Sequence, residues 1–118
     1  FRNYYREAKD NILSQNLEDI IFINDDYRNL EANNSVIYCD PPYANTKQFA
    51  NSIHFDYEEF WNYIRKWSEN NIVLISELNA PDDFECIWEK SVSRTMKSTD
   101  NTMRATEKLF TYKNSILP

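Results

Sequence analysis

The chain of 118 residues has room for one domain of ordinary size. Its residues are 42% hydrophobic, 27% charged and 15% aromatic, which is globular usage and excludes a disordered or collagen-like chain. It contains no glycine, so neither common glycine-rich phosphate loop is present. At average usage a chain of this length would contain about eight glycines. A missing segment explains their complete absence better than chance does, so we expect residues 1–118 to be a single partial domain of a longer protein.

The net charge of −6 argues against a surface that binds nucleic acid throughout. The segment from Lys90 to Lys113 differs, because it holds six basic and only two acidic residues. This segment is either a solvated hairpin with ordinary surface lysines or a contact for a polyanion. No apolar run is long enough to span a membrane, so we expect no membrane partner. Cys39 and Cys86 form no disulfide framework and no metal spacing, which fits a reducing cytoplasm and a protein without a metal.

Two elements are predicted before residue 26. Four apolar residues recur at helical spacing and predict a helix over the first ~14 residues, with one face toward a core. These residues are Phe1, Tyr5, Ala8 and Ile12. The apolar, β-branched run from Ile20 to Ile23 predicts a buried strand that ends at the polar pair Asp25 and Asp26.

The central part of the sequence predicts a strand and then a helix. Val36 to Cys39 form an apolar run that is ended by Asp40 and two prolines. Asp56 is placed to cap a helix, and an apolar face follows it at Phe60, Ile64 and Trp67. We expect Asn70 and Asn71 to end this helix in the left-handed conformation.

The remaining elements complete a sheet. Ile72 to Ile75 predict a third buried strand, which ends at Ser76 and Glu77, and two later apolar runs predict a final antiparallel pair. Near-continuous apolar strands with helical segments between them indicate an α/β sandwich with a mostly parallel sheet covered on both faces. The three tryptophans, Trp61, Trp67 and Trp88, are expected in the core.

Polar residues follow the strands where each one ends. In open α/β sheets the ligand crevice lies outside the carboxyl ends of the strands, so Asp26, Asp40, Ser76 and Glu77 are expected along one rim. Asp25 is interpreted as a solvated neighbour of Asp26. His54 has no metal-binding pattern around it and is interpreted as an ordinary residue.

The run Asp40-Pro41-Pro42-Tyr43 is the strongest chemical signal in the sequence. Two successive prolines make a stiff, extended loop, so the Pro41 carbonyl and the Asp40 carboxylate are two fixed hydrogen-bond acceptors. Two neighbouring acceptors suit an NH₂ group, because each can accept a hydrogen bond from one of its hydrogens. Such bonds would favour a pyramidal nitrogen and fix the direction of its lone pair. Tyr43 offers a flat face on which a base could stack. The alternative is a turn that merely ends a strand with a surface aspartate.

At this point the sequence resembles the adenine-specific DNA methyltransferases, particularly the phage-like and bacterial members that have Asp-Pro-Pro-Tyr after a strand. The likeness continues in the family's order through several further runs. They include Thr46, Phe55-Asp56, Phe60-Trp61, Ser68, Asn71, Val73 to Glu77, Ala80 to Phe84, Ile87-Trp88 and Thr106 to Phe110.

The resemblance implies methyl transfer from S-adenosylmethionine to the exocyclic amine of an adenine flipped out of DNA. Asp40 and the Pro41 carbonyl would hold the amine, Pro42 would stiffen the loop, and Tyr43 would stack on the base. Asp26 and Tyr27 would bind the adenine of the cofactor, and Asp40 would also belong to the cofactor site. Ser76 and Glu77 would shape the wall of the pocket.

The fold that the resemblance implies is a partial Rossmann-like sheet with a C-terminal antiparallel hairpin. It lacks the glycine-loop strand of the family, and the strand from Ile20 to Ile23 would lie beyond two missing strands, so the resemblance implies a gap in the middle of the sheet. We therefore expect the chain alone to be inactive and its parent to act in the cytoplasm of a bacterium or a phage-infected cell. A role in restriction, phage protection or regulation stays open. Two alternatives also stay open: amino methylation of cytosine or RNA, and a non-catalytic nucleic-acid-binding remnant.

Overall fold

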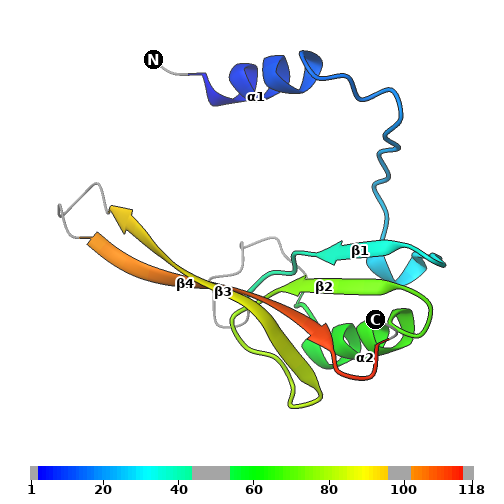
Figure 1. Ribbon diagram of the computed structural model, residues 1–118. Coiled ribbons are helices and arrows are strands. Elements are labelled where there is room, and N and C mark those ends of the chain that lie inside the picture. The colour runs from blue at the N-terminus through cyan, green and yellow to red at the C-terminus, as the bar shows by residue number, and fades with distance from the viewer. Residues whose placement is uncertain (1–2, 44–53, 96–101, 116–118) are drawn as a thin grey trace.

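The computed structural model describes residues 3–43, 54–95 and 102–115 of the chain, with side chains except at 94, 95 and 102–104 (Figure 1). The elements in order are α1 (Tyr4–Leu13), the short 3₁₀ turn η1 (Tyr27–Asn29), β1 (Val36–Cys39), α2 (Tyr57–Trp67), β2 (Ile72–Ser76), β3 (Phe84–Thr95) and β4 (Thr102–Tyr112).

The four strands form one sheet in the order β1-β2-β4-β3. β1 and β2 are parallel, whereas β4 is antiparallel to both of its neighbours. The expected α/β class and the antiparallel pair at the end of the chain are confirmed. The sheet is only partly parallel, because only one of its three described strand pairs runs in that direction.

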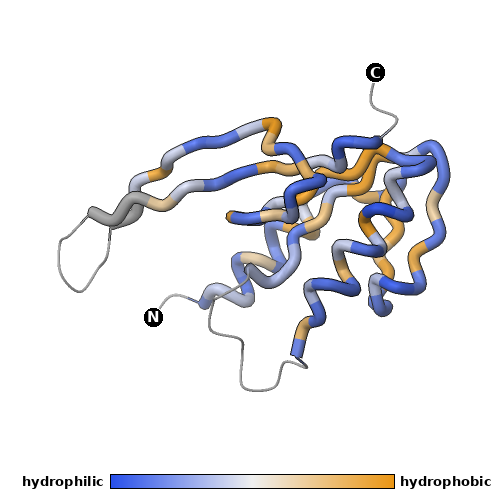
Figure 2. Tube along the Cα trace, turned by 90° about the horizontal axis from the view of Figure 1, so that it is seen from below, coloured by the Kyte–Doolittle hydropathy of each residue, from blue (hydrophilic) through white to orange (hydrophobic). Residues whose placement is uncertain are grey.

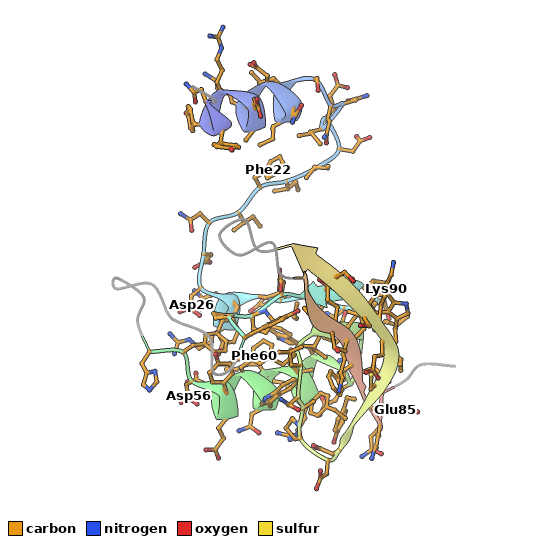
Figure 3. All side chains as sticks on the ribbon, turned by 90° about the vertical axis from the view of Figure 1, so that its left-hand side faces the viewer. Phe22, Asp26, Asp56, Phe60, Glu85 and Lys90 are labelled. Carbon is orange, nitrogen blue, oxygen red and sulfur yellow. The ribbon has the colours of Figure 1, made fainter. Side chains whose placement is uncertain are left out.

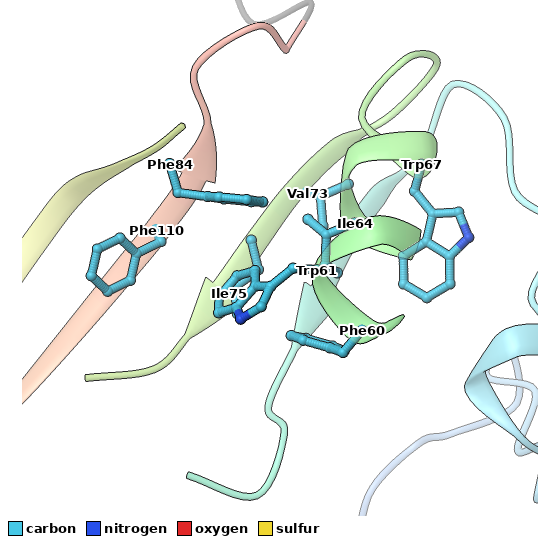
Figure 4. Packing of buried hydrophobic residues seen from close by; sticks show 8 residues of the cluster. All are labelled: Phe60, Trp61, Ile64, Trp67, Val73, Ile75, Phe84 and Phe110. Atoms are coloured by element: carbon cyan, nitrogen blue, oxygen red, sulfur yellow. The ribbon is translucent and has the colours of Figure 1, made fainter. Parts of the chain in front are cut away.

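Helix α2 covers one face of the sheet and supplies half of the core. Asp56 caps it as the sequence predicts, since its carboxylate accepts from the backbone N–H of Glu59 at 3.0 Å. The apolar face of α2 packs on β2 and the hairpin (Figure 4), and Figure 2 shows hydrophobic residues gathered in this region. The buried cluster consists of Phe60, Trp61, Ile64, Trp67, Val73, Ile75, Phe84 and Phe110.

The end of α2 differs from the sequence prediction. The helix ends at Ser68, whose backbone has right-handed angles, and among the described residues only Asn34 has a positive φ, of 54°. Asn71 instead caps the helix through its side chain, which donates to the carbonyls of Trp67 and Ala32, both at 2.9 Å. The side-chain amide of Asn71 therefore satisfies a carbonyl at the end of the helix, a role that the backbone of a left-handed residue often has at other helix ends.

Three hydrogen bonds join the segments that lead into β1 and β2. The N–H of Asn34 donates to the carbonyl of Asn70 at 2.8 Å, and the N–H of Ile72 donates to the carbonyl of Ser35 at 2.9 Å. The N–H of Ser35 also donates to the side-chain oxygen of Asn71 at 3.0 Å. These bonds hold the amino ends of the two strands side by side.

The prediction of a buried strand from Ile20 to Ile23 is wrong. This segment belongs to no helix or strand, and all four of its side chains are exposed. Figure 3 shows Phe22 on a segment that stands away from the sheet. A single strand without neighbours can bury neither its backbone polar groups nor both of its faces. The segment has the composition of a strand, but no described strand lies beside it with a free edge to which it could pair.

Helix α1 forms where the sequence predicts a helix, but it does not face a core. None of its residues is buried, and Figure 1 shows the helix apart from the sheet. Of the four residues on which the prediction was based, Phe1 lies outside the described residues. The prediction recognised the helical period correctly, but no other described element packs on its apolar face.

The expectation that the strands are covered on both faces is also wrong for β1. Ile37 and Cys39 pack against the core cluster, whereas the side chains of Val36 and Tyr38 on the opposite face are exposed. Trp88 is likewise 45% exposed, next to an irregularity in the β3–β4 register between Cys86 and Trp88. The causes differ: the outer face of β1 is left uncovered because α2 lies on one face of the sheet only, whereas residues 85–90 of β3 are exposed on both faces.

Candidate functional site

The loop after β1 lies at the carboxyl edge of the parallel strand pair. Cys39 and Ile75 are the last residues through which β1 and β2 pair with each other, so Asp40 and Ser76 follow that pair on neighbouring chains. Ser76 still pairs with Leu109 of β4. Asp40 is exposed, and the Pro41 that follows it is buried. The carboxylate of Asp40 therefore lies at the surface, while the next residue, Pro41, is packed inside the protein.

Two tyrosine hydroxyls hold this loop in place. The hydroxyls of Tyr43 and Ser76 are hydrogen-bonded at 2.8 Å, which ties the end of the loop to the end of β2. The hydroxyl of Tyr57 donates to the carbonyl of Pro42 at 2.8 Å, which ties the loop to the start of α2. The loop is thus fastened to two different elements of the fold.

A cavity of about 310 Å³ opens beside the loop, lined on one side by Asp40, Pro41 and Pro42 and on the other by Tyr27 and Phe55. This volume falls at the lower end of the range for small-molecule sites. Cys39 also lines the cavity, where burial raises the pKa of its thiol to about 11. The thiol is therefore protonated at neutral pH and is no nucleophile.

A second cavity of about 430 Å³ lies next to the first and shares Tyr27 and Phe55 with it. Four carboxylates line this second cavity, those of Asp25, Asp26, Asp56 and Glu59. Asp26 and Asp56 lie on the same side of the molecule in Figure 3. Because the only full positive charge in its described lining is that of Arg28, the cavity favours cationic or amine-bearing ligands over anions.

Asp26 is held by Arg28 two residues later. Both carboxylate oxygens accept from the guanidinium, at 2.9 and 2.7 Å, and one also accepts from the backbone N–H of Arg28 at 2.9 Å. These bonds lower the pKa of Asp26 to about 2. Asp25, interpreted from the sequence as a solvated neighbour, accepts from the N–H of Asp26 and the side chain of Asn29.

The carboxylate of Asp26 is expected to titrate with a midpoint near 2 rather than near the ordinary value of 3.8. The pKa is lowered in the folded state, so the pairing with Arg28 stabilises the fold above pH 3.8 and is lost as the pH falls toward 2. A carbon-detected NMR titration of the side-chain carboxyl measures this midpoint. In an Arg28→Gln variant the midpoint should return toward 3.8; an unchanged midpoint would show that the guanidinium is not its cause.

Tyr27 stands between the two cavities in an aromatic cluster. Its ring contacts those of Phe55, Phe60, Tyr63 and Trp67, with centroid distances of 5.7 to 6.2 Å. Burial raises the pKa of its hydroxyl. The ring is therefore fixed in orientation and offers a stable wall to both cavities.

Ser76 and Glu77 differ in their placement. Ser76 contacts Tyr43 directly, whereas Glu77 is buried and accepts from the backbone N–H of Leu78 at 2.8 Å. The structure thus brings Asp40, Pro41, Pro42 and Tyr27 to one cavity and joins Ser76 to the same loop. Sequence reasoning gave no role to Arg28 and Tyr57, and it named Phe55 only as part of the family resemblance. The one signal for Tyr57 was its position directly after the cap residue Asp56.

A larger cavity of about 600 Å³ is lined by none of the residues that the sequence predicts as catalytic, cofactor-binding or substrate-binding. It lies between η1 and the end of α2, and Asn33, Asn70 and Asn71 in its lining belong to the segments that precede β1 and β2. It is therefore at the amino edge of the sheet, away from the edge at which ligands bind in open α/β folds.

The basic segment near the end of the chain forms most of the β3–β4 hairpin. In its described part, Lys90 pairs across the strands with Glu107, and Lys108 with Glu89. Each lysine thus faces a carboxylate, which favours the solvated-hairpin interpretation for this part over a polyanion contact. Lys97 lies outside the described residues, as does Thr46 of the sequence resemblance.

The part of the chain that the structure describes contains no helix long and apolar enough to cross a membrane. Within residues 3–43, 54–95 and 102–115, no group of three or more His, Cys, Asp or Glu side chains is arranged to hold a metal ion.

Comparison with known proteins gives one finding. The model of the family described as D12 class N6 adenine-specific DNA methyltransferase matches residues 1–79, which include Asp40 and the loop around it. No curated protein and no solved structure matches the chain. Because the family match extends over more than half of its residues, the chain belongs to the D12 class N6 adenine-specific DNA methyltransferases.

Proposed function

We propose that the chain is part of an enzyme that transfers a methyl group from S-adenosylmethionine to the N6 amine of adenine in DNA. The observation that carries the proposal is the position of Asp40 on a braced loop at the carboxyl edge of the sheet, beside a cavity with aromatic walls. Membership of the family supports the reaction, and the chemistry of the loop supports the assignment of the residues.

Asp40 and Pro41 hold the amine that is methylated. The lone pair of an adenine amine is delocalised into the ring, so the nitrogen is a weak nucleophile until it becomes pyramidal. The ionised carboxylate of Asp40 and the carbonyl of Pro41 are acceptors that each take one of its hydrogens. The positive charge that develops on the nitrogen during transfer then lies next to the carboxylate, which stabilises the transition state.

Tyr43 and Pro42 position the flipped base. The amine of a paired adenine is inaccessible in the duplex, so the base has to leave the stack, at a cost of a few kcal/mol. The half-buried ring of Tyr43 offers a face for stacking, and its bond to Ser76 limits its rotation. Pro42 fixes one backbone angle immediately before this ring.

The two cavities suit the cofactor. Tyr27 and Phe55 give flat apolar walls of the kind that bind a purine, and the carboxylates of the second cavity complement a sulfonium cation better than a phosphate. Asp26 accepts from Arg28 with both oxygens, but a carboxylate has about four acceptor positions, so it can also accept from an adenine amine. S-adenosylmethionine supplies the electrophilic methyl group when it is bound.

We further propose that this chain works as part of a longer enzyme. Its apolar segment from Ile20 to Ile23 has exposed side chains and no described strand beside it, and β1 lies at an edge of the sheet with Val36 and Tyr38 exposed. Exposed apolar groups of this extent are typical of surfaces that another part of a protein covers. Residues 1–118 on their own should then bind the cofactor only weakly.

The test is analysis of the product. The full-length protein is incubated with duplex DNA and S-adenosylmethionine, and the nucleosides are then identified by mass spectrometry, with RNA as a parallel substrate and residues 1–118 as a parallel enzyme. We expect N6-methyladenine in DNA from the full-length protein alone. Methylated cytosine or methylated RNA as the main product, or no methylation by the full-length protein, would contradict the proposal.

A further inference from the structure

The loop after β1 has a degree of freedom that its prolines do not remove. A proline ring fixes φ of its own residue but leaves ψ free to vary. The ψ angle of Pro42 sets the direction in which the chain continues to Tyr43. Something other than the proline ring therefore has to fix the orientation of the Pro42 carbonyl.

Tyr57 makes that contact. Its hydroxyl donates to the Pro42 carbonyl at 2.8 Å, across fourteen intervening residues. The carbonyl cannot rotate without breaking this bond, so ψ of Pro42 is fixed by a residue on another element. Together with the bond between Tyr43 and Ser76, this restrains Tyr43 at its backbone and at its hydroxyl.

The position of Tyr57 is itself rigid. It is the first residue of α2, directly after the cap residue Asp56, and the helix is anchored by the buried residues Phe60 and Ile64. Its ring also contacts that of Phe55 edge to face, with centroids 4.9 Å apart. The hydroxyl therefore connects the loop to the most buried helix of the fold.

We infer that Tyr57 is a positioning residue, which sets the orientation of Tyr43 and the Pro41–Pro42 backbone for the flipped base. This inference rests on the proposed methyl transfer. It adds to it a residue that touches neither the base nor the cofactor. Without the hydroxyl the loop would sample other values of ψ, and only a fraction of molecules would hold the base productively.

The test is Tyr57→Phe in the full-length protein, with Tyr63→Phe on the same helix as the matched control. We expect kcat of Tyr57→Phe to fall about three- to tenfold, the range expected for loss of one neutral hydrogen bond, with KM for DNA changed less than about twofold. The melting temperature should stay within a few degrees of the parent, and Tyr63→Phe should leave kcat unchanged. A merely structural role would lower the melting temperature and leave kcat per folded molecule intact, which would overturn the inference.

A second readout does not depend on catalysis. The backbone amide of Tyr43 is attached to the Pro42 carbonyl, so its NMR resonance reports on the bond to Tyr57. In protein labelled with ¹⁵N-tyrosine, Tyr57→Phe should shift and broaden the Tyr43 amide signal, whereas Tyr63→Phe should leave it in place. An unmoved signal would overturn the inference even if the enzyme is active. Absence of methylation by the parent protein would contradict the proposed function, and the amide signal would still decide whether Tyr57 holds the loop.

Discussion

Replacing Asp40 by alanine in the full-length protein is expected to lower kcat by at least about 100-fold, the effect of removing one preorganised group that stabilises transition-state charge. The variant loses both an acceptor for the amine and the negative charge beside the developing cation. Because Asp40 is exposed, the free energy of unfolding should change by less than about 0.5 kcal/mol. Single-turnover methylation and thermal unfolding measure the two effects.

The control for this substitution is Asp19→Ala, which removes another exposed carboxylate, far from the loop in sequence, and should leave kcat unchanged. An Asp40→Ala variant that methylates DNA at the parental rate would refute the catalytic role. It would also favour the interpretation of Asp40-Pro41-Pro42-Tyr43 as a turn that simply ends a strand.

Replacing Ile64 by alanine is expected to destabilise the protein by about 2–5 kcal/mol, since large-to-small changes in a core lose transfer energy and leave a cavity. Ile64 is fully buried between α2 and the sheet, where Val73 and Ile75 of β2 are also fully buried (Figure 4). The melting temperature of the full-length protein should fall by at least about 5 °C.

Ile87→Ala is the matched control for the core substitution, because it removes the same atoms from a side chain on β3 that is 48% exposed. Its melting temperature should stay close to that of the parent. If both variants melted at the same temperature as the parent, α2 would not be docked on β2 through Ile64. If Ile87→Ala were the more destabilising of the two, the main core would not lie between α2 and β2.

The sequence predicted the elements that are stabilised by the described residues. β1 and β2 were found from their apolar runs, and α2 from Asp56 and the spacing of Phe60 and Ile64. These signals come from short stretches of sequence, and in the structure each of these elements also packs on other described elements. The segment from Ile20 to Ile23 has an equally strong local signal but remains without a pairing strand, and a period-based prediction cannot detect that absence.

The candidate site was predictable in part for the same reason. The residues Asp40 to Tyr43 are contiguous, so their stiffness and their acceptors could be deduced from composition alone. Tyr57 lies fourteen residues beyond Tyr43, and its contact with Pro42 depends on how the chain returns to the sheet. Arg28 and Asp26 are only two residues apart, but the hydrogen bonds between them depend on the η1 turn, for which the sequence offered no distinct signal.

The bonds among Asn34, Ser35, Asn70 and Asn71 are distant from the chemistry, yet they determine which way Asp40 points. Side chains alternate along a strand, so a slip of one residue between β1 and β2 would turn every side chain of β1 to the opposite face. The carboxylate would then point away from the base it is proposed to hold. The asparagines at the amino ends of β1 and β2 thus fix the register of the two strands, and the orientation of Asp40 at their carboxyl ends depends on residues that do not line its cavity.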